Sequence, residues 1–366
     1  MAAAPASPGA DPARAAGPAG PAGLSVEVGV RAGLAVAVPL LVLLAVGRLD
    51  LTAYATFGAF TALYGRNEPY RTRIRSVSIA GVALLATIAL GILVAVLGEP
   101  IGLLVPLLVL VVTGGILLAA TFQLIPAQPL FFVFALLVCA AVPTTVGEVP
   151  LRLGIALGAA AFSWLLTMSG WVVRRSALAR GSAAEGRLGS VFFKNLARRP
   201  RTDAAAIRDP RVWLTVGQSV IGVLIVGGVA MLFGLGHAYW AVVSLVAVIP
   251  PPRAAHSISR SLHRIIGTIV GVGLTVLVLF WSPPPIVVIG VIVVCQVFAE
   301  ILVGRHYGSA LVFITPMALS VSYLATPVPL SELAIDRVLE TVLGAAVGIM
   351  LMLAARGLER AKALGP

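Results

Sequence analysis

Residues 101–121 read IGLLVPLLVLVVTGGILLAAT, a run that contains no charged side chain. An α-helix rises about 1.5 Å per residue, so roughly 20 apolar residues cross the hydrocarbon core of a bilayer. A helix also satisfies its own backbone hydrogen bonds, which lipid cannot do. The run therefore predicts a transmembrane helix.

Similar apolar segments lie on both sides of this run, and together they predict about twelve spans. The segments cover residues 28–47, 51–65, 76–97, 101–121, 128–143, 151–173, 212–234, 238–251, 262–281, 284–304, 308–325 and 333–355. Those at 51–65, 128–143 and 238–251 are short. We interpret them as tilted helices, half-helices or helices that continue into the basic flanks. The predicted number of spans is therefore twelve to within one or two helices.

The composition extends this conclusion to the whole chain. Hydrophobic residues make up 59% of the sequence and charged residues 11%, and the mean hydropathy is +1.05. Soluble domains carry about a quarter charged residues, so a water-soluble fold of this size is excluded. We predict an all-α polytopic membrane protein whose main partner is the lipid bilayer.

Basic residues between the spans predict the orientation. With a cytoplasmic N-terminus, the inner loops receive most of them: Arg66, Arg71, Arg73, Arg75, those of residues 174–211, Arg253, Arg260, Arg264 and Arg305. The outer loops receive only Arg48, Arg152 and Arg337. Because basic loops stay in the cytoplasm, we expect both termini inside, in the inner (cytoplasmic) membrane of a bacterial cell.

The chain divides into two apolar halves and three polar segments. These are a disordered tail at 1–24, a first half at 25–173, a linker at 174–211, a second half at 212–355 and a cytoplasmic tail at 356–366. The strongly basic linker predicts a cytoplasmic segment that touches anionic lipid headgroups. Only Phe192 and Phe193 interrupt its charges, so nucleic acid is not an expected partner.

The two halves resemble each other in the order of their features. Each has an aromatic second segment, around Tyr54 and around Tyr239, and each ends in a helix that starts with an arginine, Arg152 or Arg337. Six spans are an even number, so the halves point the same way. We predict two parallel six-helix repeats related by an axis along the membrane normal.

Three pairs of glycines are spaced four residues apart in the spans. They are Gly154/Gly158, Gly267/Gly271 and Gly344/Gly348. Such spacing lets helices approach closely. It is compatible with a mobile helix interface in a transporter and with simple packing.

Ionisable residues inside the spans are candidates for function, because a charge near the bilayer centre costs about 2.5–3.5 kcal/mol on insertion scales. Glu300 could carry a proton, or it could pair with Arg305 at the inner surface. Arg31 lies in the first turn of its helix, where its side chain could also extend to the interface.

A polar cluster is expected at the outer start of the last helix. Asp336 and Glu340 share one helix face, and Arg337 precedes Glu340 by three residues, so they predict either an ion-pair network or an anion and proton site. His237, Tyr239 and Trp240 lie at the same interface. They are typical of an aromatic belt, and an aromatic cage near arginine would also suit a flat aromatic carboxylate.

No motif indicates an enzyme. The sequence contains no phosphate-binding loop of the GxxxxGK[ST] type, and no Ser/His/Asp or paired-metal constellation is evident. Cys139 and Cys295 lie in apolar segments without metal-ligand spacing. We therefore expect no catalytic residues, no metal and no cofactor, and ion or proton coupling remains as the energy source for uphill transport.

Short motifs in the second half carry a family resemblance. They are Tyr239-Trp240-Ala, Arg264-Ile-Ile-Gly267-Thr268 with Gly271, and Arg337 leading to Gly344-Ala-Ala. This pattern resembles fusaric-acid-resistance-like proteins, a group that includes aromatic acid exporters and, distantly, the plant aluminium-activated malate transporters. The resemblance implies export of small organic anions, often aromatic acids, driven by the proton motive force.

The expected function is therefore a transporter that exports small organic acids. The candidate substrate-binding residues are Arg31, Tyr54, His237, Tyr239, Trp240 and Arg337, and the candidate proton-coupling residues are Glu300, Asp336 and Glu340. Expected partners are small organic anions, with a homo-oligomer or an accessory export subunit left open. The alternative is a non-transporting membrane scaffold or envelope-assembly protein, which is favoured if the buried charges pair locally instead of lining one cavity.

Overall fold

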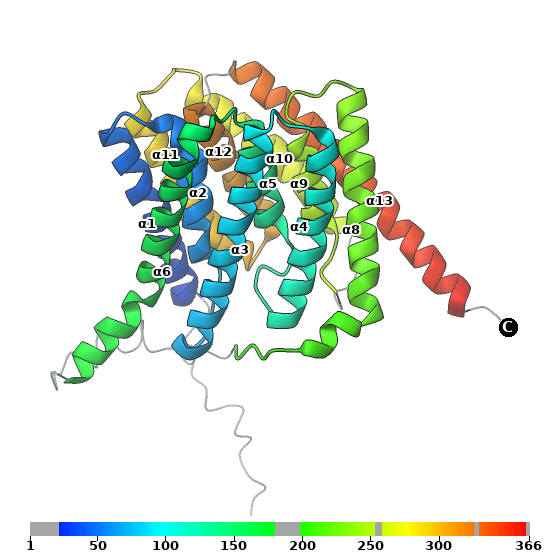
Figure 1. The fold of residues 1–366 in the computed structure, drawn as a ribbon, viewed down its shortest axis with the longest axis horizontal. Coiled ribbons are helices and arrows are strands. Elements are labelled where there is room, and N and C mark those ends of the chain that lie inside the picture. The colour runs from blue at the N-terminus through cyan, green and yellow to red at the C-terminus, as the bar shows by residue number, and fades with distance from the viewer. Residues whose placement is uncertain (1–21, 180–197, 253–257, 326–328, 364–366) are drawn as a thin grey trace, which may run out of the picture.

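Helices account for all the regular secondary structure of the residues that the computed structural model describes, which are 22–179, 198–252, 258–325 and 329–363 (Figure 1). The first half contains α1 (Ala22–Ala45), α2 (Thr52–Ala59), α3 (Tyr70–Val96), α4 (Ile101–Phe122), α5 (Leu130–Ala141) and α6 (Val149–Ala179). The second half contains α8 (Pro210–Leu232), α9 (Tyr239–Val248), α10 (Ile258–Leu279), α11 (Pro285–Val303), α12 (Tyr307–Ala325) and α13 (Leu330–Ala363). The 3₁₀ turns are η2 (Leu49–Leu51), η3 (Phe60–Leu63), η4 (Val146–Glu148) and η5 (Ala204–Arg208).

Each predicted span falls on one of these helices. In the described part of the chain, nine helices are long and apolar enough to cross a membrane. The other three are α2, α5 and α9, the segments predicted to be short. At about 1.5 Å per residue they cannot cross a hydrocarbon core of about 30 Å alone. The polytopic all-α membrane fold is confirmed.

Two of the short helices lie inside the helix bundle. Every residue of α2 is buried, and so is α9 from Trp240 to Val248. A helix that is apolar on all sides is typical of the core of a large protein. By contrast, α8 exposes large apolar side chains such as Leu224 and Met231, as expected of a lipid-facing helix.

The same helix pairs pack in both halves. In the first half, α2 packs on α6, α3 on α5 and α1 on α2. In the second half, α9 packs on α13, α10 on α12 and α8 on α9. These pairs occupy the same places in the order of the six helices, namely second with sixth, third with fifth and first with second.

Contacts between the halves are also matched. The first helix of each half packs on the fourth helix of the other half, α1 on α11 and α8 on α4. The fifth helix of each half packs on the second helix of the other, α5 on α9 and α12 on α2. A two-fold relation between the halves requires such matched pairs, and the parallel arrangement of the two repeats stays a prediction.

Glycines allow the closest approach between α1 and α11. A Cβ added to Gly29 would lie 2.8 Å from the carbonyl oxygen of Val297, and one added to Gly33 would lie 2.6 Å from the Cγ2 of the same residue. Small residues at a helix contact let the two backbones approach and gain van der Waals packing. The seam between the halves therefore depends on the absence of side chains at these two positions.

Two of the three predicted glycine pairs also lie in helix contacts. The pair at 267 and 271 faces α12, and the pair at 344 and 348 faces α9. The pair at 154 and 158 lies on the exposed surface of α6, where an added Cβ would meet nothing within 4 Å in the described ranges. Close helix packing is therefore confirmed for the pairs at 267/271 and 344/348, and not for the pair at 154/158.

The ends of the helices differ slightly from the predicted segments. The helix α1 begins at Ala22, inside the predicted tail, and α6 continues to Ala179, inside the predicted linker. Residues 180–197 of the linker lie outside the described residues, and the chain resumes at 198–203 without regular secondary structure and continues into η5. The helix α13 continues to Ala363, so the predicted C-terminal tail is largely helical.

Candidate functional site

The two ends of the bundle are named by what they carry. At the linker end, α3, α8 and α10 begin and α4 and α11 end, and α8 follows the linker (Figure 1). The opposite end is called the Arg337 end, because α13 starts there and Arg337 lies in its second turn. Most of the predicted site residues lie at the Arg337 end.

Arg337 is stacked on an aromatic ring in the core. Its side chain is 1% exposed, and its guanidinium carbon lies 3.8 Å from the centre of the Trp240 ring on α9. Attraction between a cation and an indole face is strongest where water is excluded. The Nε and Nη1 atoms of Arg337 have no hydrogen-bond partner among the described residues. The side chain is therefore held in place while part of its donor capacity is unused.

Two carboxylates accompany Arg337 on α13. One oxygen of Glu340 accepts a hydrogen bond of 3.0 Å from the backbone N–H of His237, and its second oxygen, Oε2, has no partner within the described ranges. An Asp336 oxygen lies 2.7 Å from Nδ1 of His237. The structure thus brings His237, Asp336, Arg337 and Glu340 together, as the sequence predicted.

Aromatic rings surround the same place. The Tyr239 and Trp240 rings lie 5.1 Å apart, and Phe134 of α5 lies 4.8 Å from Trp240. Phe134 also contacts Phe57 of α2 at 5.0 Å. Phe134 and Phe57 belong to the first half, so this aromatic cluster joins the two halves beside the buried guanidinium.

The first half contains a corresponding pair. Nη1 of Arg152, in α6, donates a hydrogen bond of 2.6 Å to the Tyr54 hydroxyl, and its guanidinium carbon lies 5.2 Å from the centre of that ring. Arg152 also donates to Thr144, to the carbonyl oxygen of Pro143 and to Glu148. Tyr54 is thus bound to an arginine that the site prediction omitted. The matched arginine at the start of each last helix was the signal that could have identified it.

The two arginines differ in how many of their hydrogen-bond donors have a partner. Arg152 makes hydrogen bonds through both terminal nitrogens to four different residues besides a long contact to Val142, whereas two nitrogens of Arg337 have no partner in the described part of the chain. A buried polar group without a partner is costly. Arg152 therefore joins α2, α6 and the loop before η4, whereas Arg337 keeps two hydrogen-bond donors without a partner among the described residues.

A row of buried polar side chains continues from Arg337 toward the linker end. Ser244 of α9 donates a hydrogen bond of 3.4 Å to Thr341 of α13, and Ser244 accepts one of 3.2 Å from Arg264 of α10. Arg264 also donates to the hydroxyl of Tyr307 over 3.1 Å. Arg264 is 3% exposed and interacts electrostatically with Arg337. Two buried guanidiniums thus lie in the same region as the buried carboxylate of Glu340.

Comparison with known proteins matches this part of the chain to a family. Residues 223–351 match the family model described as fusaric acid resistance protein-like. The predicted family resemblance is confirmed. The matched residues, called below the fusaric-acid-resistance-like segment, include Trp240, Arg264, Arg337 and Glu340.

One relative among curated proteins is an uncharacterized membrane protein, YvaC, of Bacillus subtilis strain 168. It is 31% identical to this chain over 93 residues, which are 25% of this chain and 15% of the relative. The match thus spans a small part of the relative's length. No solved structure matches this chain.

Glu300 of the fusaric-acid-resistance-like segment lies at the linker end, apart from Arg337. It forms an ion pair of 3.6 Å with Arg66, which follows η3 in the first half, and not with Arg305, which was one of the two alternatives. The other alternative, a role in carrying a proton, stays a prediction. Arg31, also at this end, pairs with Glu27 on its own helix at 2.6 Å. The structure therefore does not bring Arg31 or Glu300 together with the candidate site at the Arg337 end.

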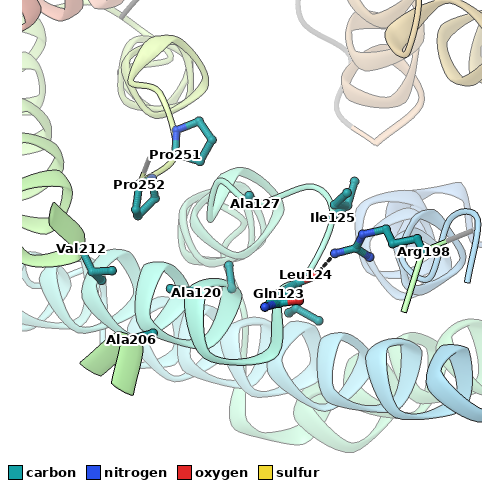
Figure 2. A pocket seen from close by; sticks show the side chains of 11 residues that line it. Ala120, Gln123, Leu124, Ile125, Ala127, Arg198, Ala206, Val212, Pro251 and Pro252 are labelled. Atoms are coloured by element: carbon teal, nitrogen blue, oxygen red, sulfur yellow. Dashed lines mark hydrogen bonds between the residues drawn. The ribbon is translucent and has the colours of Figure 1, made fainter. Parts of the chain in front are cut away.

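A cavity of about 300 Å³ also lies at the linker end (Figure 2). Its lining residues are Ala119, Ala120, Gln123, Leu124, Ile125, Ala127, Arg198, Ala206, Val212, Pro251 and Pro252. Most of them lie outside the fusaric-acid-resistance-like segment, and none was predicted as a site residue. The cavity is formed by three loops and helix ends that are far apart in the sequence, so no local motif indicates it.

The charged group of this cavity is held by a buried carboxylate. Nη1 of Arg198 donates to Glu68, which is fully buried, and Nη2 donates to the carbonyl oxygen of Gln123. Burial lowers the pKa of the Arg198 guanidinium, and the charge of Glu68 opposes this shift. A guanidinium stays protonated in proteins, so Arg198 keeps its charge.

No group of three or more His, Cys, Asp or Glu side chains that could hold a metal ion occurs within the described ranges.

Proposed function

We propose that this protein is a membrane transporter that exports small organic acids, with aromatic acids as the main substrate class. One observation carries the proposal. Arg337 is 1% exposed and packed on Trp240, and two of its nitrogens lack hydrogen-bond partners among the residues described. A buried, unpaired cation is costly, and a bound anion would supply the missing partner.

The surrounding groups favour a carboxylate with an aromatic body. A carboxylate can accept two parallel hydrogen bonds from a guanidinium, and a flat ring can pack against the indole and the Phe134 ring. The family description supports the same class, since fusaric acid is an aromatic carboxylic acid. The like-charged Arg264 adds a second attraction for an anion in this region.

Proton coupling is assigned to the carboxylates that surround Arg337. Glu340 is fully buried, and its Oε2 atom has no hydrogen-bond partner in the described residues. This oxygen is therefore available to bind and release a proton. Asp336 with His237 forms a second proton-exchanging pair close by. Glu300, at the linker end of the bundle, is a further candidate for proton coupling.

The proposed direction is outward across the cytoplasmic membrane of a bacterium, with both termini inside. A membrane potential of 100 mV, negative inside, favours the exit of one negative charge by about 2.3 kcal/mol. An exporter of organic anions therefore gains part of its driving force from the potential alone. The proton gradient would add the remainder.

Inverted membrane vesicles test the proposal. In this orientation export appears as uptake, so labelled aromatic and aliphatic carboxylates are offered with and without a proton gradient. We expect gradient-dependent uptake that falls at least tenfold in Arg337→Gln and remains in Arg48→Gln, which changes an exposed arginine. Absence of uptake of every acid by folded wild-type protein would reject the transport proposal.

A non-transporting scaffold is the second candidate, and specific observations favour it. Arg31 pairs with Glu27, Glu300 with Arg66 and Asp336 with His237, and none of them lines the cavity at the linker end. Local pairing of buried charges is the behaviour expected of a structural bundle. Arg337 does not follow this behaviour, and the vesicle experiment above separates the two candidates.

A further inference from the structure

The two seams between the halves can be compared position by position at the linker end. Glu300 lies three residues before the end of α11, and Ala119 lies three residues before the end of α4, the fourth helix of the other half. Arg66 lies three residues after the last helical residue of η3, and Pro251 lies three residues after the end of α9. Arg66 and Glu300 thus correspond to Pro251 and Ala119.

The corresponding positions carry side chains of different size and charge. At the seam between α1 and α11, the side chains of Arg66 and Glu300 meet in an ion pair of 3.6 Å. At the seam between α8 and α4, Ala119 and Pro251 have short, uncharged side chains, and both line the cavity of about 300 Å³. The cavity therefore lies where the other seam is filled by a long ion pair.

The walls of the cavity are apolar and rigid. Pro251 and Pro252 follow α9, and their rings fix the backbone φ angle. Val212 and Ala206 face them from the start of α8 and from η5, and Arg198 lies on the other side of the pocket (Figure 2). A preformed apolar site with few polar groups is typical of small-molecule binding, and a volume of 300 Å³ is at the lower end for such sites.

Arg198 is the one charged residue among the described residues that line the cavity. Arg198 uses one donor on Glu68 and one on the Gln123 carbonyl, whereas a guanidinium has five. A second guanidinium, that of Arg75, binds the same stretch of linker through Thr202 and the carbonyl oxygen of Pro200. Arg75 thus holds the linker that carries Arg198 in place, and the remaining donors of Arg198 are available to an incoming anion.

We infer that this cavity binds a small amphipathic carboxylic acid, with its apolar body against the proline wall and its carboxylate toward Arg198. The substrate class rests on the proposed function, and the site itself does not. The cavity is then a second binding site at the linker end, separate from Arg337, and it takes up the acid on that side of the membrane. The linker is part of the site because it supplies Arg198.

Equilibrium binding of tritiated 1-naphthoate to the full-length protein in detergent tests this inference. The measurement is made in the Arg337→Gln variant, so that the site at the Arg337 end does not contribute. Ala120→Phe fills the cavity, and Arg198→Gln removes its charge. Ala161→Phe on the exposed surface of α6 is the matched control for the added ring. Uncharged 1-naphthylmethanol tests whether the carboxylate is recognised.

We expect Ala120→Phe and Arg198→Gln each to weaken naphthoate binding at least tenfold, and Ala161→Phe to change it less than twofold. Naphthylmethanol is expected to bind at least tenfold more weakly than naphthoate. Unchanged naphthoate binding in folded Ala120→Phe would overturn the inference, and so would equal binding of the alcohol. Ala120→Phe keeps the inference testable if Arg198→Gln unfolds because Glu68 loses its partner. Binding that persists while vesicle uptake is absent would reject transport and leave this site in place.

Discussion

The hydroxyl of Tyr54 accepts a 2.6 Å hydrogen bond from Arg152, a residue 98 positions later in the chain. This bond joins the buried helix α2 to the start of α6 in the first half. In the second half, Trp240 and Arg337 occupy the equivalent places, but they interact only through the ring face, at 3.8 Å. A phenol can accept a hydrogen bond in its ring plane and an indole cannot. The difference between the two aromatic residues thus leaves donors of Arg337 without a partner in the described part of the chain, and to these donors we propose that an anion binds.

Tyr54→Phe is expected to destabilise the protein by about 1–2 kcal/mol, since it removes one charge-assisted hydrogen bond in a buried site. Equilibrium unfolding in detergent measures the change. Tyr323→Phe on α12 is the control, because its hydroxyl makes no hydrogen bond to the described residues, and it should shift stability by less than about 0.5 kcal/mol. Transport should survive Tyr54→Phe if the pair is structural. Equal stability of Tyr54→Phe and wild type would contradict the role given to Arg152.

Trp240→Leu is expected to reduce uptake of aromatic acids more than uptake of aliphatic acids. The substitution keeps an apolar residue at the position but removes the ring face on which Arg337 and an aromatic substrate would pack. A change of five- to tenfold in the ratio of the two uptake rates corresponds to about 1–1.4 kcal/mol. Competition in inverted vesicles between benzoate and a short aliphatic acid gives this ratio directly. An equal fall for both acids would indicate that Trp240 supports the fold and not the selection.

Gly29→Ala is expected to destabilise the protein by about 1–3 kcal/mol, because the added Cβ would lie 2.8 Å from a backbone oxygen of α11. Gly154→Ala on α6 is a matched control, since nothing in the described structure lies within 4 Å of its added Cβ. Thermal unfolding in detergent should therefore separate the two variants. If Gly154→Ala proved as damaging as Gly29→Ala, the exposed surface of α6 would have to be an interface.

Glu300→Gln and Arg66→Gln are expected to be coupled. The side chains are 13% and 16% exposed and 3.6 Å apart, so each single change leaves a largely buried charge without its partner. A double-mutant cycle on the free energy of unfolding should give about 1–2 kcal/mol of interaction. Arg305→Gln is the control, because the pair joins Glu300 to Arg66 and not to Arg305. Additive effects of the two substitutions would show that the pair is not formed in the folded protein.

Sequence reasoning located the membrane helices because apolar length alone identifies them. The run 101–121 corresponds to α4, and the three segments predicted to be short are α2, α5 and α9. The burial of α2 and α9 was not predictable from that pattern, because a short apolar run has the same composition whether it faces lipid or the centre of a bundle. The cluster of Asp336, Arg337 and Glu340 was predictable because helical spacing places these residues together.

The remaining contacts depend on which helices meet, and local spacing carries no such information. A pair with Arg305, five residues away, was one of the two roles that the sequence left open for Glu300, but its partner is Arg66 from the other half of the chain. The cavity combines Ala119, Arg198 and Pro251, which belong to three separate segments. The hydrogen bond of Tyr54 to Arg152 was likewise not predicted. Each difference follows from packing between distant segments.

The packing of α1 on α11 has a consequence for how the protein is made. Ribosomes add about 5–20 residues per second, so α11 emerges roughly 12 to 50 s after α1. During this interval, the glycine-lined face of α1 has no partner in its own half and must contact lipid or a membrane chaperone. A first half made alone would keep that face of α1 without a partner. The order of synthesis therefore limits how long the first half can persist in the cell before the second half covers it.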